Sequence, residues 1–514
     1  MQNDPAQAAA WCVALLREGR TEEAGRFLAP VRERLRNPAL PLKQAEKFAR
    51  LVLAAHLEAI DEGDDPLLPG AWRGGLGAPA FELLLDVLQY AAVADEPLEW
   101  SCTDLREALL DAAAKPVVDA AILDLASALS VQAFRMEYVL AESHAEEVAT
   151  DALRAEIEDA LARGAEVAPL KLAILALYRP LHRLAHADRI AALARSDSAR
   201  FAVLLQVQVL EPLAEAAIRP AIRALTPIAD QTSQAVQEQY EEHPYPRWHR
   251  LPVAAGPGSG EEEPPTEARP PQSRNLIAGC GTGRQVLSVA MAEPKTHFTA
   301  VDLSRVSLAY AIRKAREHGV ANVDFAHADI LALPDTGLTF DFISCVGVIH
   351  HMREPALGLR ALRRLMAHDS GLKVAVYTES GRQAIVAGIG LREQYALPST
   401  PAGIREFRQV VAAQPEDHPV RQIMRFGDFY SVSGCRDLIF HVMEHRYTIP
   451  AFVAMAAGEG LRVQAIQPPE QARARFAAKH PDPAAFADLE AWHRFETENP
   501  GVFGSMYRFL LEKA

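Results

Sequence analysis

A proline-rich stretch at residues 251–274 separates two parts of the chain that have different hydrophobic patterns. It holds six prolines, three glycines and four glutamates in 24 residues. Such a composition buries too little apolar surface to fold by itself, and its prolines favour an extended chain. We therefore expect a mobile linker or an ordered surface loop here. Either one marks a domain boundary, which a chain of 514 residues requires because it is too long for one hydrophobic core.

Residues 1–235 have apolar side chains at helical spacing and almost no strand-like alternation, which predicts an all-helical domain of about ten helices. Residues 16–24, followed by Phe27 and Leu28, resemble the turn and second helix of a tetratricopeptide repeat. The pattern does not recur at the repeat's period of about 34 residues, so a degenerate solenoid and a plain helical bundle both remain open. A segment rich in tyrosine and proline follows at residues 236–250, and we expect it to pack on the C-terminal domain.

Residues 275–514 alternate short apolar runs with helical stretches. Repeated strand–helix units of this size predict an α/β fold with a parallel sheet covered by helices on both faces. The expected strands are Asn275–Ala278, His297–Asp302, Asn322–Ala326, Phe340–Val346, Leu372–Tyr377, Leu461–Ile466 and Ser505–Glu512. The expected helices between them include Gln285–Ala292, Ser304–His318 and Pro355–Ala367.

A glycine-rich loop joins the first of these strands to the helix after it. Glycines allow a tight turn and close approach of a ligand, and a helix N-terminus offers free N–H groups to an anionic group. A simple tight turn is the alternative explanation. Arg284 stands where a dinucleotide-binding motif has its third glycine, which disfavours a nicotinamide or flavin cofactor. The loop residues are Gly279, Cys280, Gly281, Thr282 and Gly283.

Two carboxylates follow the next two strands. Asp302 ends the second strand, where a carboxylate can accept hydrogen bonds from both hydroxyls of a ribose. Ser304 is the better candidate for capping the next helix, which leaves Asp302 available for a ligand. Asp329 follows the third strand, where it could meet the amino group of an adenine.

Together these features resemble a class I S-adenosylmethionine-dependent methyltransferase of a bacterial type that carries an N-terminal helical, tetratricopeptide-like region. The resemblance is detailed over residues 275–378. It implies a Rossmann-like seven-stranded sheet with S-adenosylmethionine across the carboxyl ends of the strands. One departure is Ile277, because the family often has an acidic residue at that position. The residues expected at the cofactor are Gly279, Cys280, Gly281, Gly283, Asp302, Leu303, Asp329, Ile330 and Val346.

Methyl transfer needs an aligned nucleophile, exclusion of water and sometimes removal of a proton. His350 and His351 follow the fourth strand, where one of them could act as the base or as a polar anchor. We expect an insertion at residues 379–450 to form a lid that determines the substrate. His441, Glu444 and His445 have the spacing of one zinc-peptidase motif, but we expect a polar lid helix and no metal. The candidate substrate contacts are Tyr240, Tyr245, Asp437, His441, Glu444 and Arg446.

The resemblance predicts a methyltransferase whose acceptor is unknown. The helical domain would recruit a protein or peptide, or would help to enclose a small-molecule substrate. Two alternatives stay open: a non-catalytic scaffold that binds the cofactor, and a transferase that moves a group other than methyl. The five scattered cysteines and the absence of a basic N-terminal leader or long apolar span predict a cytoplasmic protein without a membrane segment.

The formal net charge is −14, which disfavours a nucleic-acid partner because both would be anionic. The excess negative charge is local. Residues 51–150 contain 4 basic and 19 acidic side chains, whereas residues 251–514 are nearly balanced, with 28 basic and 29 acidic. The acidic segment is either a solvated surface or a docking face for a basic protein or peptide.

Overall fold

The computed structural model describes residues 5–37, 43–60, 69–112, 120–251 and 273–514. It divides into two compact units. The helical unit comprises residues 1–214, 397–416 and 421–435, and the sheet unit comprises residues 215–396, 417–420 and 436–514. Residues 215–250 thus group with the sheet, and the segment expected as a lid is divided between the units. Residues 252–272 of the expected linker lie outside the described residues.

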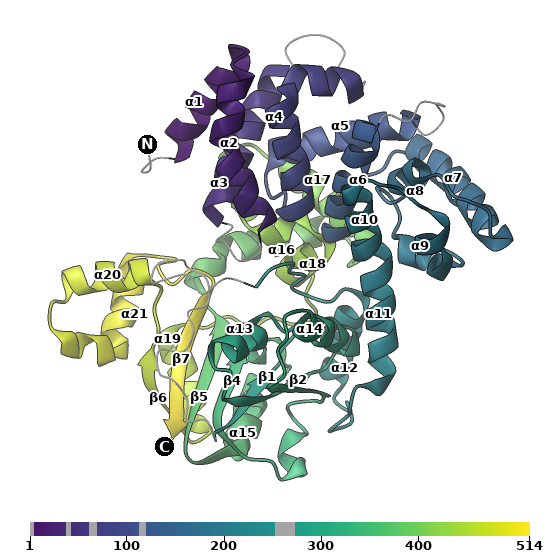
Figure 1. Ribbon diagram of the computed structural model, residues 1–514. Coiled ribbons are helices and arrows are strands. Elements are labelled where there is room, and N and C mark those ends of the chain that lie inside the picture. Colours follow the sequence, from purple (N-terminus) through teal and green to yellow (C-terminus); the bar gives the residue numbers. More distant parts are fainter. Residues whose placement is uncertain (1–4, 38–42, 61–68, 113–119, 252–272) are drawn as a thin grey trace. The chain divides into compact units, whose positions relative to one another are not determined.

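A seven-stranded sheet forms the centre of the sheet unit (Figure 1). The strand order is β3-β2-β1-β4-β5-β7-β6, with β1–β5 parallel and β7 antiparallel to both β5 and β6. This confirms the expected α/β class and the seven strands. The strands are β1 (Arg274–Ala278), β2 (His297–Asp302), β3 (Val323–His327), β4 (Phe340–Val346), β5 (Met366–Tyr377), β6 (Leu461–Ile466) and β7 (Met506–Lys513).

Helices cover the sheet, and the alternation of side chains along β1 explains how. Ile277 belongs to a buried cluster with residues of α13 (Arg284–Ala292) and α14 (Arg305–Glu317). Leu276 belongs to a second cluster with residues of α15 (Pro355–Leu365), α19 (Ile449–Gly458) and α21 (Leu489–Glu498). Successive residues of a strand point to opposite faces, so one short strand supplies both cores. α15 ends at Leu365, two residues earlier than expected, because β5 already begins at Met366.

The described part of the helical unit contains helices and no strand, which confirms the prediction for this region. Its first two helices are joined by a short turn at Gly19, as the sequence indicated. Whether the helices form a solenoid stays a prediction. They are α1 (Pro5–Arg17), α2 (Thr21–Arg36), α3 (Lys43–Ile60), α4 (Pro69–Tyr90), α5 (Glu96–Ala112), α6 (Ala120–Arg135), α7 (His144–Arg163), α8 (Pro169–Leu175), α9 (Ile190–Leu193), α10 (Ala199–Leu205) and α17 (Pro401–Ala412).

Two further helices cross the division between the units. α11 (Glu211–Ile218) crosses it at residue 214, and α18 (Val432–Ile439) crosses it at residue 435. α12 (Gln231–Glu242) belongs wholly to the sheet unit. The chain therefore passes from one unit to the other inside continuous helices at these two places.

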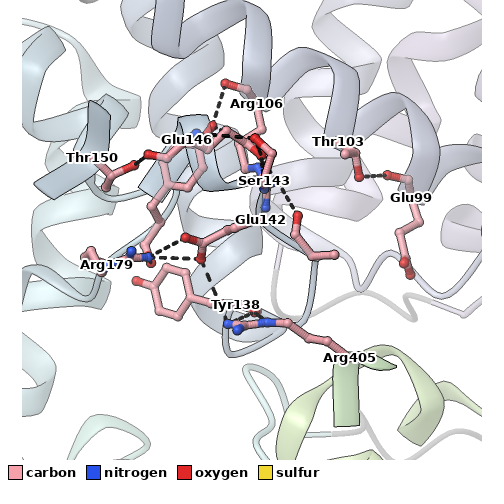
Figure 2. Close-up of polar contacts among 12 residues, drawn as sticks. Glu99, Thr103, Arg106, Tyr138, Glu142, Ser143, Glu146, Thr150, Arg179 and Arg405 are labelled. Carbon is pink, nitrogen blue, oxygen red and sulfur yellow. Dashed lines mark hydrogen bonds and ion pairs between the residues drawn. The ribbon is translucent and has the colours of Figure 1, made fainter. Parts of the chain in front are cut away.

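Carboxylates of the acidic segment bind arginines within the helical unit. Asp86 is fully buried and accepts hydrogen bonds from Arg32 and Arg200, both at 2.8 Å. Figure 2 shows a second group, in which the carboxylate of Glu142 accepts a hydrogen bond of 2.8 Å from the guanidinium of Arg179. A buried carboxylate needs such partners, because an unpaired charge in the interior is costly. Part of the negative charge is therefore structural.

The helical stretch Ala199–Ala221 has a mean hydropathy of 1.5 over an 18-residue window, and it is long enough to cross a membrane. Its residue Gln208 is fully buried and donates to the carbonyl oxygens of Ser130 (2.8 Å) and Ala176 (3.1 Å). An amide that is hydrogen-bonded in this way belongs to a protein core. We therefore assign α10 and the turn after it to the core of the helical unit.

Candidate active site

The glycine loop lies between β1 and α13 and has the geometry of a close backbone approach. Gly279, Gly281 and Gly283 all have positive φ, at 77°, 53° and 85°. A Cβ atom at Gly279 would lie 2.3 Å from the side chain of Val348, and one at Gly283 would lie 2.7 Å from Ala311. Residues other than glycine are therefore disfavoured at positions 279 and 283, both by the positive φ and by the clash that a Cβ atom would cause. The N–H groups of Gly279 and Cys280 both donate to the carbonyl of Val301 at 2.9 Å, which holds the loop over β2.

Asp302 stands at the carboxyl end of β2 beside this loop. Its two carboxylate oxygens accept the N–H groups of Gly281 (2.7 Å) and Ser304 (2.9 Å). Ser304 itself caps α14 by accepting the N–H of Ser307, as predicted. Burial raises the pKa of Asp302 to about 6, although hydrogen bonds from the backbone at Ser304 and Gly281 oppose this shift. Each oxygen keeps acceptor capacity, so the carboxylate can still receive ribose hydroxyls.

The remaining residues predicted at the cofactor also lie at the carboxyl ends of strands. Leu303 follows Asp302 directly, and Val346 is the last residue of β4. Asp329 and Ile330 follow β3 and are buried. Burial raises the pKa of Asp329, which accepts hydrogen bonds from the N–H of Leu331 and the hydroxyl of Ser233. In an open α/β sheet, ligands bind at this edge, where the strand order reverses between β1 and β4.

α12 lies over the same edge of the sheet. The side-chain amide of Gln237 is 3.1 Å from Nε2 of His327, at the end of β3. The hydroxyl of Ser304 donates to the carbonyl of Tyr240 at 3.1 Å. Further along, Trp248 donates its indole N–H to the carbonyl of Thr282 (3.1 Å) and lies against the glycine loop. The segment after α12 therefore packs on the sheet unit, as the tyrosine- and proline-rich sequence suggested.

Tyr245 is placed differently from the other predicted substrate contacts. Its backbone carbonyl is 3.1 Å from the position that a Cβ atom of Gly281 would take. Tyr245 therefore lies at the cofactor loop, and its role as a substrate contact stays a prediction.

A group of histidines lies beside α12 at the carboxyl end of β4. His350 and His351 occupy a buried turn, and the rings of His351 and His441 stack with 3.6 Å between their centroids. Burial lowers the pKa of all three imidazoles, and for His350 and His351 it does so strongly. These side chains are neutral at physiological pH, which a proton acceptor requires.

The hydrogen bonds of His351 and His441 fix where their protons are. Nδ1 of His351 lies 2.7 Å from the carbonyl of Met443, so this nitrogen carries the proton and Nε2 has the free lone pair. Nδ1 of His441 instead accepts the N–H of Met443 at 3.2 Å, so its proton is on Nε2. Nε2 of His441 is 3.3 Å from the hydroxyl of Tyr240.

Tyr240 completes this group by donating its hydroxyl to Asp437 at 2.6 Å. Burial and the neighbouring Asp437 raise the pKa of Tyr240, so the phenol keeps its proton. Burial also raises the pKa of Asp437, and no arginine or lysine among the described residues forms an ion pair with it. The site thus holds a buried carboxylate with a phenol donor, and the nearby positive charge of Arg382 forms its ion pair with Glu444 instead.

His351, Asp437 and His441 offer ligand atoms within 4.8 Å of one another, close enough to hold a metal ion. The hydrogen bonds oppose this use. Nε2 of His441 carries a proton, and two face-to-face imidazoles direct their lone pairs side by side rather than toward one point. The group is arranged for hydrogen bonding.

Glu444 and Arg446 lie at the same site but pair within the protein. Arg382 donates to both carboxylate oxygens of Glu444, at 3.0 Å and 2.6 Å, and Arg446 contacts Glu444 at 3.2 Å. The predicted lid helix over residues 441–446 is wrong, because this segment is non-helical and α18 ends at Ile439. Irregular backbone after α18 instead carries both His441 and Glu444 at this site.

Two residues of the candidate site were not predicted from the sequence. Tyr377 ends β5, and its ring lies 3.9 Å from that of His350. Arg382 follows it and stacks on Tyr377 at 3.6 Å. Their position after the fifth parallel strand was a usable signal, since β1–β4 had already marked that edge of the sheet.

The sheet unit is a class I S-adenosylmethionine-dependent methyltransferase domain. Its strand order, the glycine loop and the carboxylates of Asp302 and Asp329 define this class. Residues 276–369 match the family model described as a methyltransferase domain. An uncharacterized protein of Synechococcus sp., syc1184_c, is 31% identical over 45% of this chain and 59% of its own length. A ubiquinone biosynthesis O-methyltransferase of Pseudomonas aeruginosa is 31% identical over 26% of this chain and 57% of its own length.

The chain thus spans less than two thirds of the length of these relatives. Among solved structures, PKMT2 from Rickettsia typhi in complex with AdoHcy is similar, with a TM-score of 0.37 and 18% identity over 49% of this chain and 50% of that protein. The methyltransferase domain was predicted from the sequence, and the family model confirms it.

Proposed function

We propose that this protein transfers the methyl group of S-adenosylmethionine to an amine that enters the site as a cation. The observation that carries the proposal is Asp437, a buried carboxylate that forms no direct ion pair among the described residues, because the nearby guanidinium of Arg382 pairs with Glu444. Such a charge is costly unless a ligand compensates it. An ammonium group is the acceptor that would supply both the positive charge and hydrogen-bond donors.

The residues around the glycine loop fit the cofactor. Three glycines with positive φ allow the tight turn that brings backbone N–H groups to the end of β1, and the Asp302 carboxylate suits the ribose hydroxyls. When bound, S-adenosylmethionine supplies an electrophilic methyl group on a sulfonium sulfur. All other steps fall to the protein, which must orient the amine and remove its proton before it can attack.

Nε2 of His351 is the proposed base, because its lone pair is free and His351 offers a ring nitrogen within 4.8 Å of a carboxylate oxygen of Asp437. The Met443 carbonyl holds the ring by its other nitrogen, which fixes the tautomer. The proton taken from the ammonium would leave an imidazolium beside the carboxylate of Asp437, so the charge stays compensated. His350 is fully buried with both ring nitrogens unpaired in the structure, and it would contact the acceptor as a polar anchor.

The acceptor amine is proposed to belong to a basic polypeptide that the helical unit recruits. On α5, Trp100 is 62% exposed, and Asp104, Glu107 and Asp111 continue the same helix face and are exposed. An aromatic ring beside carboxylates suits lysine and arginine side chains. A small amine metabolite is the second candidate acceptor. All five cysteines are free and buried, which supports a reducing, cytoplasmic location.

The test uses labelled S-adenosylmethionine with a lysine-rich peptide as the amine probe and the same peptide fully acetylated as the control. We expect label in the first peptide only, and a loss of about a hundredfold in rate for Asp437→Asn, as for an uncompensated ion pair in the interior. Asp369→Asn, which changes an exposed aspartate, serves as the matched control. Label in the acetylated peptide, or label that mild base releases from the lysine-rich peptide as methanol, would refute an amine acceptor.

A further inference from the structure

Glu137 in the helical unit lies far in sequence from the residues of the active site, yet it binds the helix that carries Asp437. Its carboxylate accepts the N–H of Ser433, in the first turn of α18, at 2.5 Å. The carbonyl of the preceding residue, Met136, accepts the N–H of Val432 at 3.4 Å. The first N–H groups of a helix have no partner inside the helix, and a carboxylate there is favoured by the helix dipole as well.

The backbone at this point is unusual. Glu137 and Tyr138 follow the end of α6 and have φ of 56° and 58°, a region that favours glycine. Two consecutive non-glycine residues in this region persist only when the surroundings hold them there. The backbone N–H of Tyr138 donates to Ala133, and its hydroxyl donates to the side chain of Gln208. The strained turn thus presents both side chains to specific partners.

The inserted segment is fastened to the same turn. Arg405 donates twice to the carbonyl of Tyr138, at 3.0 Å and 2.8 Å, as Figure 2 shows. Arg408 donates to the carbonyls of Val139 (3.3 Å) and Phe429 (2.7 Å), and its side chain is buried. These contacts hold the start of α18 at the Glu137 turn within the helical unit.

Asp437 follows Ser433 by four residues on α18, which is one helical turn or about 6 Å along the axis. At that position Asp437 receives the hydroxyl of Tyr240. A rigid helix anchored at its first turn fixes the carboxylate one turn later. We infer that Glu137 is a positioning residue that sets the place of Asp437 through α18. This inference rests on the proposed function, in which Asp437 binds the acceptor amine.

The test variant is Glu137→Gly. Glycine removes the contact with Ser433 and suits the positive φ, so the protein should fold at least as well as the wild type. We expect methyl transfer to the lysine-rich peptide to fall about three- to thirtyfold, the range of coupling through a packed element. The affinity for S-adenosylmethionine should stay within about twofold, since the cofactor residues lie on other elements. Glu147→Gln, at an exposed position of α7, is the control.

Two further variants distinguish a positioning role of Glu137 from a general loss of structure. In an Asp437→Asn background, Glu137→Gly should cause no additional loss of rate, because Glu137 acts only through that carboxylate. Glu137→Gln, which keeps an acceptor oxygen, should recover part of the rate. An unchanged rate in Glu137→Gly, or a full additional loss in the double variant, would overturn the inference.

Amide hydrogen exchange is independent of methyl transfer. It should show faster exchange at Ser433 in Glu137→Gly than in the wild type, with no change in Glu147→Gln. If the wild type transfers no methyl group to any probe, the proposed function fails, while this exchange measurement still reports whether Glu137 holds α18. Unchanged exchange at Ser433 would contradict the anchoring itself.

Discussion

The two halves of the proposed active site are built in different ways. The cofactor half comes from the ends of β1–β4 and lies within residues 279–346, where each residue follows a strand. The acceptor half brings together Tyr240 from α12, the histidine turn after β4, and Asp437 and His441 from near residue 440. A local half is fixed by the sheet itself, whereas a half assembled from distant segments depends on the packing that holds each of them.

This difference predicts that changes to the two halves have separable effects. Substitutions in the cofactor half should weaken binding of S-adenosylmethionine, and those in the acceptor half should slow transfer without affecting binding.

The largest effect is expected for His351→Gln. Loss of a general base lowers the rate by about a hundredfold or more. Glutamine keeps a donor for the Met443 carbonyl, so the fold around residue 443 should persist. The measurement is single-turnover transfer to the lysine-rich peptide, with calorimetry of cofactor binding beside it. A weaker cofactor affinity at an unchanged rate would place His351 in the wrong half.

Asp302→Ala should reduce the affinity for S-adenosylmethionine by about a hundredfold, because two hydrogen bonds from ribose hydroxyls to a charged group are lost. Calorimetry with S-adenosylmethionine and with S-adenosylhomocysteine checks this value. Asp324→Ala is the matched control, since Asp324 lies on β3 with a side chain that is 79% exposed. Equal affinities in wild type and Asp302→Ala would exclude the proposed ribose contact.

A change of pH should have a smaller effect on the affinity for S-adenosylmethionine. Burial raises the pKa of Asp302 to about 6, and only its ionised form accepts both ribose hydroxyls. The affinity for S-adenosylmethionine should therefore be constant above pH 7 and fall as the pH drops through 6, by at most about tenfold per pH unit. Asp302→Asn does not titrate and should show a flat profile. An affinity that rises on acidification would contradict this sign.

The elements that carry the proposed cofactor half could be predicted because the information for them is local. A glycine loop must directly follow a buried strand, and Asp302 must directly follow the next one, so order along the chain is also order in space. The strand boundaries were recoverable for the same reason. Six of the seven strands lie within one residue of their expected limits, whereas β5 begins at Met366, six residues before its expected start.

For the proposed acceptor half, the role of the named residues stays a prediction, and the helix expected over residues 441–446 was wrong. Tyr240, Asp437 and His441 were named from their residue types, but their contacts span about two hundred positions of the chain. The spacing of His441, Glu444 and His445 suggested a helix, while the structure has an irregular, non-helical segment there. Helical spacing alone carries no information about whether tertiary contacts, such as those of Met443 with two histidines, favour another conformation.

For the acidic segment at residues 51–150, too, the sequence did not reveal the tertiary contacts. Its charge was evident from composition, yet composition does not separate an exposed stripe on α5 from Asp86 and Glu142, which bind arginines inside the helical unit. The pairing becomes visible only when distant helices are brought together.

The most direct test of the account combines two measurements on Asp437→Asn: cofactor affinity by calorimetry and the single-turnover rate of methyl transfer to the lysine-rich peptide. The account predicts an affinity within about twofold of the wild type and a rate lower by about a hundredfold. A wild-type rate, or a rate and an affinity that fall together, would contradict a separate acceptor half built on Asp437.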